Sequence, residues 1–170
     1  ILLSTDDLDG EVAAAVRVRM GNAGQACNAG KRFIVADGLY DDFLARFTAA
    51  LANLRPDDPR SADTALGPLS STAAAERLED QLRRAVESGA EVHLGGRRDG
   101  AFFEPTVISS VDPRSGAGQE EFFGPVAQMY RVSSEQEAIE LANATPYGLG
   151  AYLRTTDPDQ AQRVADELEV

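Results

Sequence analysis

The stretch RFIVADGLYDDFLARFTAALANL, Arg32 to Leu54, decides the fold class. It opens with a short β-branched apolar run that ends at Asp-Gly, which is typical of a strand followed by a turn. In the remainder, apolar residues recur three or four positions apart, at Phe43, Phe47, Leu51 and Leu54. This spacing predicts an amphipathic helix. A strand that leads directly into a helix is the repeating unit of an α/β domain.

The same alternation continues on both sides of this stretch. Apolar or β-branched runs predict further strands at 1–3, 91–96, 126–132 and 148–156. The segment 97–111 is predicted to contain an Asp-Gly turn at 99–100 and then an extended, β-branched run. Capped periodic patterns predict helices at 4–20, 71–90, 133–145 and from 157 onward. We therefore expect an open, twisted, mainly parallel sheet flanked by helices, with ligands bound beyond the carboxyl ends of the strands.

Length and composition narrow the function. The 170 residues make one ordinary domain, 1–170, and we expect it to be a piece of a longer protein. A formal net charge of −12 disfavours nucleic acid, because phosphates need a basic surface. No apolar run reaches the roughly 18 residues of a membrane span, so no membrane partner is expected. The single cysteine cannot form an internal disulfide, which favours a reducing compartment and hence a cytoplasmic location.

That cysteine, Cys27, lies in a loop of small residues, GNAGQACNAGK. A free cysteine is usually a small buried hydrophobe, but these neighbours offer no bulky side chains to enclose a sulfur. Glycines permit tight turns and leave main-chain N–H groups free to face an oxyanion. Lys31 and Arg32 favour the thiolate, although in a strand only one of them can face the sulfur. With one cysteine and one histidine, no metal site is expected.

Three ordered motifs resemble the aldehyde dehydrogenase family. NAGQAC, at 22–27, is similar to the family's active-site cysteine motif. QEEFFGPV, at 119–126, is similar to its second hallmark, E-E-[IFM]-F-G-P-V. ELANATPYGLGAYLRTTD, at 140–157, is similar to its third, L-A-N-x-x-x-Y-G-L-x-A-x-[VI]-x-[TS]-x-D. The resemblance covers essentially the whole chain and implies the fold of that family's catalytic domain.

The resemblance also implies roles for individual residues. Cys27 would be the nucleophile that forms a thiohemiacetal and then a thioester. Glu121 would hydrogen-bond the nicotinamide-ribose hydroxyls of NAD or NADP, and Phe123 would pack on the ribose and nicotinamide. From the residues alone, Glu120 and Glu121 would form a solvated turn, and both rings at 122–123 would lie in the core. Core packing is likewise expected for Tyr147 and Leu149, with a place near a substrate tunnel as the alternative.

Parts of the family's machinery are expected outside 1–170. By the resemblance, the cofactor-binding domain and the general-base glutamate lie upstream, and the oligomerisation arm lies downstream. We therefore expect the isolated chain to bind NAD or NADP weakly or not at all and to be inactive alone. The full-length enzyme is expected to be a homo-oligomer.

The resemblance further suggests a substrate. CNAGKRFIV and GLGAYLRTTD are similar to the succinate-semialdehyde branch, so a small semialdehyde is expected to be oxidised to its acid. Gly21 stands where many members of that branch carry an arginine, so an anchor for the substrate carboxylate would lie elsewhere. Two alternatives stay open. One is an acylating dehydrogenase that passes the thioester to coenzyme A, and the other is a non-catalytic interaction domain, which a buried Cys27 would support.

Overall fold

The computed structural model describes residues 1–170 as alternating helices and strands. In chain order the elements are α1 (Leu8–Met20), the 3-10 turn η1 (Gly21–Gly24), β1 (Arg32–Ala36), α2 (Asp37–Ala52), α3 (Thr72–Glu87), β2 (Glu91–Leu94), β3 (Arg98–Asp99), β4 (Phe102–Phe103), β5 (Thr106–Ser109), the 3-10 turn η2 (Ala117–Gln119), β6 (Val126–Val132), α4 (Glu135–Asn143) and α5 (Pro158–Glu167). No helix combines the length and the apolar character needed to cross a membrane.

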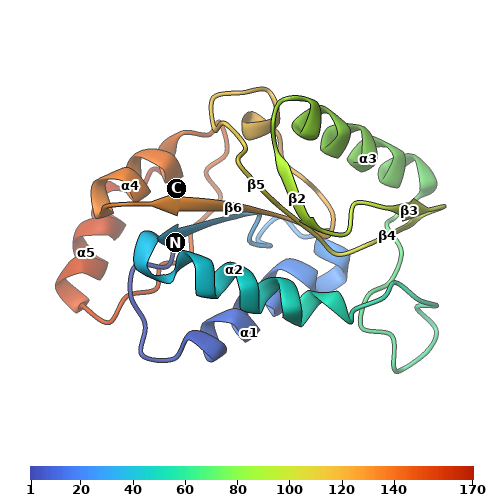
Figure 1. The fold of residues 1–170 in the computed structure, drawn as a ribbon, viewed down its shortest axis with the longest axis horizontal. Coiled ribbons are helices and arrows are strands. Elements are labelled where there is room, and N and C mark those ends of the chain that lie inside the picture. Colours follow the sequence, from blue (N-terminus) through green and yellow to red (C-terminus); the bar gives the residue numbers. More distant parts are fainter.

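A four-stranded sheet in the order β1-β6-β5-β2 forms the middle layer (Figure 1). β6 pairs in parallel with β1 on one side and with β5 on the other. Only β2, at the edge, runs antiparallel. The short strands β3 and β4 form a separate hairpin across the predicted Asp-Gly turn. The expected mainly parallel sheet flanked by helices is confirmed.

Successive residues of β6 face opposite layers of the core, because side chains alternate between the two faces of a strand. Val126 and Tyr130 belong to the larger apolar cluster, together with residues of α3 and α4. Ala127 and Met129 belong to the second cluster, together with residues of α1 and α2. Helices therefore cover both faces of the sheet, and the strand is buried on both sides.

The predicted strands at 1–3 and 148–156 are largely wrong. Leu2 forms one parallel bridge to Val35 and one to Arg154, and neither segment pairs over a longer length. Their backbone hydrogen bonds still place residues 1–3 between β1 and the 152–154 segment. The 148–152 stretch is exposed and contains two glycines, and no strand lies along its outer edge to extend the pairing.

Side-chain caps fix the starts of four helices. Asp7, Ser71, Ser134 and Asp157 accept hydrogen bonds from backbone N–H groups in the first turns of α1, α3, α4 and α5. The predicted Asp-Gly turn after β1 is wrong, because α2 begins at Asp37 itself. The Asp37 carboxylate favours that start, since it lies at the positive end of the helix dipole and accepts a 2.7 Å hydrogen bond from Arg131.

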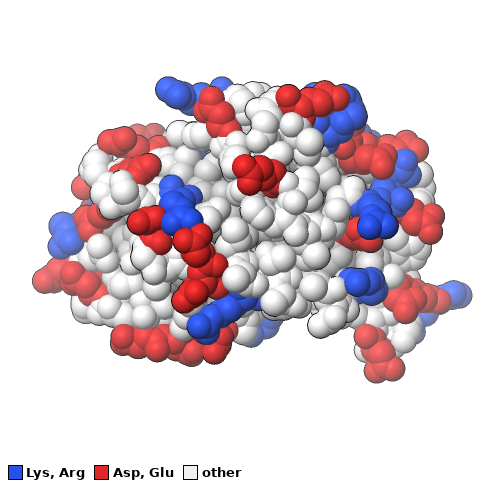
Figure 2. All heavy atoms as spheres, in the orientation of Figure 1, with Lys and Arg blue, Asp and Glu red and all other residues white.

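Charged side chains of both signs are interspersed over the face of the molecule in Figure 2. Many of them pair within one helix or between neighbouring elements; Arg83 with Glu87 on α3 and Arg98 with Glu79 are examples. Exposed pairs of this kind each contribute about 0–1 kcal/mol, so the two apolar clusters carry most of the stability.

Buried Tyr130 predicts a loss of stability in alkali. Its hydroxyl donates a 2.6 Å hydrogen bond to Gln128 Oε1, and burial raises its pKa to about 12. Because the folded pKa exceeds that of the unfolded chain, this contribution is full below about pH 10 and is lost as the pH rises through 12. The loss amounts to about 2–3 kcal/mol.

Urea unfolding of wild type and Tyr130→Phe across this alkaline window measures the effect. The variant should start with a lower free energy of unfolding and then lose less of it as the pH rises. Parallel curves for the two proteins would show that the tyrosine does not drive the alkaline loss.

Candidate active site

Two of the three sequence motifs meet at the end of the sheet where the parallel strands β1 and β6 begin. The cysteine loop at 24–30 directly precedes β1, and the 119–125 segment directly precedes β6. These two strands are adjacent and parallel, so the segments that precede them lie at the same edge. The expectation that the site lies beyond the carboxyl ends of the strands is therefore wrong for this pair of motifs. The reason is topological, since both motifs lead into their strands rather than out of them.

Cys27 is an exposed free thiol at this edge. It lies in the bend that follows η1, where Asn22, Ala23 and Gly24 all adopt positive φ angles. An exposed sulfur argues against the structural role in which a cysteine fills space in the core. Its backbone N–H donates to no acceptor within the chain.

Gly24 lets the two motifs touch backbone to backbone. Its φ is +72°, a left-handed conformation that glycine adopts at little cost. A Cβ at this position would lie 2.2 Å from the carbonyl oxygen of Gly124 and 2.5 Å from Nη2 of Arg19. No side chain fits between the cysteine loop and the Gly124 carbonyl. The contact fixes the distance between the two motifs.

Arg19 donates hydrogen bonds to carbonyls at both ends of the cysteine loop. Its side chain is fully buried, and it donates from Nη1 to the Gly30 carbonyl at 3.1 Å and from Nη2 to the Gly24 carbonyl at 2.5 Å. Burial lowers the pKa of Arg19 to about 10, while the charge of Glu121 acts in the opposite direction. Sequence reasoning did not find this residue. The signal was present, because Arg19 follows Val16 by three positions and so falls on the apolar stripe of α1.

Lys31 joins the first motif to the second. Its Nζ lies 2.8 Å from the carbonyl oxygens of both Ala26 and Cys27 and 2.8 Å from Oε1 of Glu121. It also lies 5.7 Å from the centre of the Phe123 ring. The neighbouring arginine turns away and donates to the last carbonyls of α4. Of the two cations, Lys31 is the one at the cysteine loop, and its side chain is 15% exposed.

The two glutamates of the second motif are both paired, so the expected solvated turn is wrong. Glu120 accepts hydrogen bonds from Arg84 at 2.8 Å and from Gln81 at 2.9 Å, both on α3. Glu121 faces the cysteine loop instead, with a side chain that is 32% exposed. The two phenylalanines that follow, at 122 and 123, differ in their burial. The expected core position is confirmed for the ring at 122, which is fully buried, and wrong for Phe123, which is 46% exposed.

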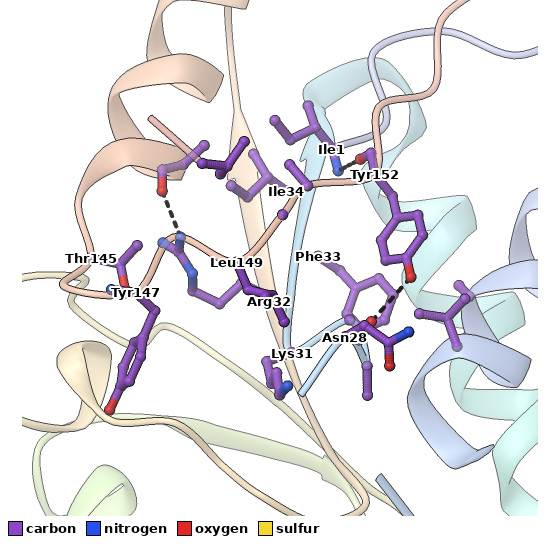
Figure 3. A pocket seen from close by; sticks show the side chains of 18 of the residues that line it. Ile1, Asn28, Lys31, Arg32, Phe33, Ile34, Thr145, Tyr147, Leu149 and Tyr152 are labelled. Carbon is purple, nitrogen blue, oxygen red and sulfur yellow. Dashed lines mark hydrogen bonds between the residues drawn. The ribbon is translucent and has the colours of Figure 1, made fainter. Parts of the chain in front are cut away.

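A cavity of about 740 Å³ lies beside the cysteine loop, with Cys27, Lys31 and Glu121 in its lining. Tyr147 and Leu149 of the third motif also line it; both are more than half exposed, so their expected place in the core is wrong. They follow α4 in the irregular stretch that leads back to the sheet edge. Figure 3 shows them with Lys31 among the residues that line the cavity. Its volume suits a small-molecule site.

The fold and this site together define an α/β domain that presents a single thiol in a backbone-fixed loop at the edge of a small-molecule cavity. A family model described as the aldehyde dehydrogenase family matches residues 1–170, and the chain belongs to that family.

Individual relatives agree with this assignment. The chain is 48% identical over 172 residues to a protein of Deinococcus radiodurans named succinate-semialdehyde dehydrogenase [NADP(+)], covering 99% of this chain and 36% of that one. It is 36% identical, with a TM-score of 0.95, to aldehyde dehydrogenase 21 of Physcomitrella patens, solved with the reaction product succinate, covering 99% of this chain and 36% of that one.

A third relative bears on the cofactor. Betaine aldehyde dehydrogenase of Staphylococcus aureus, solved in complex with NAD+, is 35% identical with a TM-score of 0.94, over 99% of this chain and 35% of that one. The relatives are therefore NAD(P)-dependent oxidoreductases by name or bound cofactor. This chain spans little more than a third of the length of these three proteins.

Proposed function

We propose that this chain is the nucleophile-bearing part of an NAD(P)-dependent aldehyde dehydrogenase that oxidises succinate semialdehyde to the acid. The observation that carries the proposal is the exposed Cys27 at the mouth of a small-molecule cavity. Family membership and the names of the similar proteins support the reaction and the substrate. Exposure of the thiol also favours this proposal over a non-catalytic interaction domain.

The proposed chemistry begins with attack of the Cys27 thiolate on the aldehyde carbon, which gives a thiohemiacetal. The unengaged N–H of Cys27 would donate to the oxygen that becomes negative in this step. NAD or NADP, held by Glu121 and Phe123, would supply the hydride acceptor for this oxidation. Hydrolysis of the thioester on Cys27 would then release the acid and return the thiol. The cavity walls would hold the short aldehyde against the sulfur.

Glu121 and Phe123 fit the part of the cofactor that the resemblance assigns to them. A half-buried carboxylate can accept hydrogen bonds from two ribose hydroxyls, and an exposed ring offers an apolar face for packing. Both lie next to Lys31, so the cofactor would meet the cysteine loop at this residue. The resemblance places the general-base glutamate outside these 170 residues, and general-base catalysis is worth about 10²–10⁴-fold. We therefore expect the 170 residues alone to oxidise aldehydes at no useful rate.

A chimera tests the proposal directly. Residues 1–170 replace the matching segment of the Deinococcus radiodurans relative, and succinate-semialdehyde-dependent reduction of NADP+ is followed by absorbance. The chimera should oxidise the semialdehyde, and the isolated chain should not. A folded chimera that binds NADP+ but does not oxidise the aldehyde would rule the proposal out. Release of an acyl-coenzyme A in place of the acid would instead support the acylating alternative.

Glu121→Gln in the chimera tests the cofactor contact. The neutral amide has one acceptor oxygen in place of two charged ones and so holds the two ribose hydroxyls more weakly. KM for NADP+ should therefore rise about tenfold while the KM for the semialdehyde changes little. Glu140→Gln, at an exposed position on α4, serves as the matched control and should leave both constants unchanged. An unchanged KM for NADP+ in Glu121→Gln would show that this carboxylate does not bind the cofactor.

A further inference from the structure

One ammonium group binds two successive carbonyls at the nucleophile. Nζ of Lys31 lies 2.8 Å from the carbonyl oxygen of Ala26 and 2.8 Å from that of Cys27. These two oxygens belong to the peptide units on either side of the Cys27 Cα. The third neighbour of Nζ is the Glu121 carboxylate, whose Oε1 lies 2.8 Å away and helps to keep the ammonium in place.

Because the peptide bond is planar, these contacts also fix the direction in which two N–H groups point. The chain contains no cis peptide, and in a trans peptide the C=O and N–H point in opposite directions. The N–H of Cys27 shares a peptide unit with the Ala26 carbonyl, and the N–H of Asn28 shares one with the Cys27 carbonyl. Both N–H groups therefore point away from Lys31, and neither donates to an acceptor within the chain.

The rest of the loop is held by other side chains, so Lys31 is the specific anchor of these two peptide units. Arg19 binds the carbonyls at both ends of the loop. The hydroxyl of Tyr152 donates to the carbonyl of Asn28 at 3.1 Å, a contact drawn as a dashed line in Figure 3. Removal of Lys31 would leave the ends fixed and would free the two central peptides to rotate.

We propose that Lys31 is a positioning residue that aims the Cys27 N–H at the developing oxyanion. A cation on the carbonyl also polarises the peptide and makes its N–H a stronger donor. Lys31 itself would touch no reacting atom. The inference rests on the proposed role of Cys27 as the nucleophile and adds the residue that orients its donor.

Two reactions of the Cys27 thiol distinguish an effect of Lys31 on the oxyanion donor from an effect on the ionisation or exposure of the sulfur. Acetylation by p-nitrophenyl acetate passes through a tetrahedral oxyanion: the sulfur bonds to the carbonyl carbon, and p-nitrophenolate leaves with the electron pair. Alkylation by iodoacetamide displaces iodide from carbon and develops no oxyanion. Both reactions need the thiolate. Their rate ratio therefore cancels changes in thiol ionisation and exposure and reports the oxyanion donor.

The experiment measures this ratio on the 170-residue chain, with N-acetylcysteine as the reference thiol. The wild-type ratio should exceed the reference. Lys31→Met should lower it about tenfold, a fraction of the 10²–10³ found when an oxyanion donor is removed outright. Lys31→Arg, which keeps a cation at the carbonyls, should restore most of it. Arg17→Met removes a cation from an exposed site on α1 and should leave the ratio unchanged.

Circular dichroism and thermal unfolding of each variant establish that the compared chains are folded, and Lys31→Gln replaces Lys31→Met if the latter is not. Equal ratios in wild type and the folded Lys31 variant would overturn the inference, as would a wild-type ratio equal to that of N-acetylcysteine. A Cys27 that reacts with neither reagent would overturn the proposed function itself. The two failures are thus distinguishable.

Discussion

Replacement of Cys27 by serine should lower semialdehyde oxidation by the chimera at least about 10⁴-fold. A serine hydroxyl is ionised to a negligible extent near neutral pH and is a much weaker nucleophile than a thiolate, so attack on the aldehyde should be slow even in the complete chimera. Nucleotide binding should persist, because the contacts proposed for it come from the second motif. The measurement is the steady-state rate of NADP+ reduction, together with NADP+ binding by fluorescence titration.

A matched variant makes this prediction specific. Cys27→Ala should be as inactive as Cys27→Ser, because both lack the thiol. A serine variant that keeps more than about a tenth of the wild-type rate would place the nucleophile elsewhere.

Gly24→Ala should destabilise the chain by about 2–4 kcal/mol and slow alkylation of Cys27. The new Cβ would meet the Gly124 carbonyl at 2.2 Å, and the positive φ adds strain for any residue with a side chain. The obstacle is backbone on one side and a buried guanidinium on the other, so neither can move away cheaply. The cysteine loop must shift instead.

Gly21→Ala is the matched control for this prediction. It lies three residues earlier, its φ is −52°, and no atom lies within 4 Å of the position of its Cβ. Its effect on the free energy of unfolding should stay within about 0.5 kcal/mol. Urea unfolding and iodoacetamide labelling measure both variants. Equal unfolding curves for the two would show that the contact between Gly24 and Gly124 does not constrain the loop.

Local signals in the sequence predicted the secondary structure well. The apolar spacing of Phe43, Phe47 and Leu51 corresponds to the buried side of α2, and capping serines fixed the starts of α3 and α4. The third-motif strand failed because pairing depends on a neighbour along its whole length, which a local pattern cannot reveal. The glycines at 148 and 150 lie in an exposed stretch beside one bridging residue.

The site was predicted from the sequence only where a motif resembled a family. Cys27 stood out because it is unique, but Glu121 and Phe123 were singled out by resemblance alone. The contact between Lys31 and Glu121 joins residues 90 positions apart, and it follows from the pairing of β1 with β6 rather than from any local pattern. Arg19 was missed because its neighbours on α1 gave a normal amphipathic pattern. The buried guanidinium is explained by the two loop carbonyls that it hydrogen-bonds, and these contacts are known only from the structure.

The most direct test of the account is the second-order rate of iodoacetamide alkylation of the native 170-residue chain, followed by intact mass near neutral pH. Cys27 is the only cysteine, so the site of labelling needs no assignment. We expect one label per chain, because Cys27 is exposed in a loop whose backbone carbonyls are held by Arg19 and Lys31. A folded chain that takes up no label would contradict it.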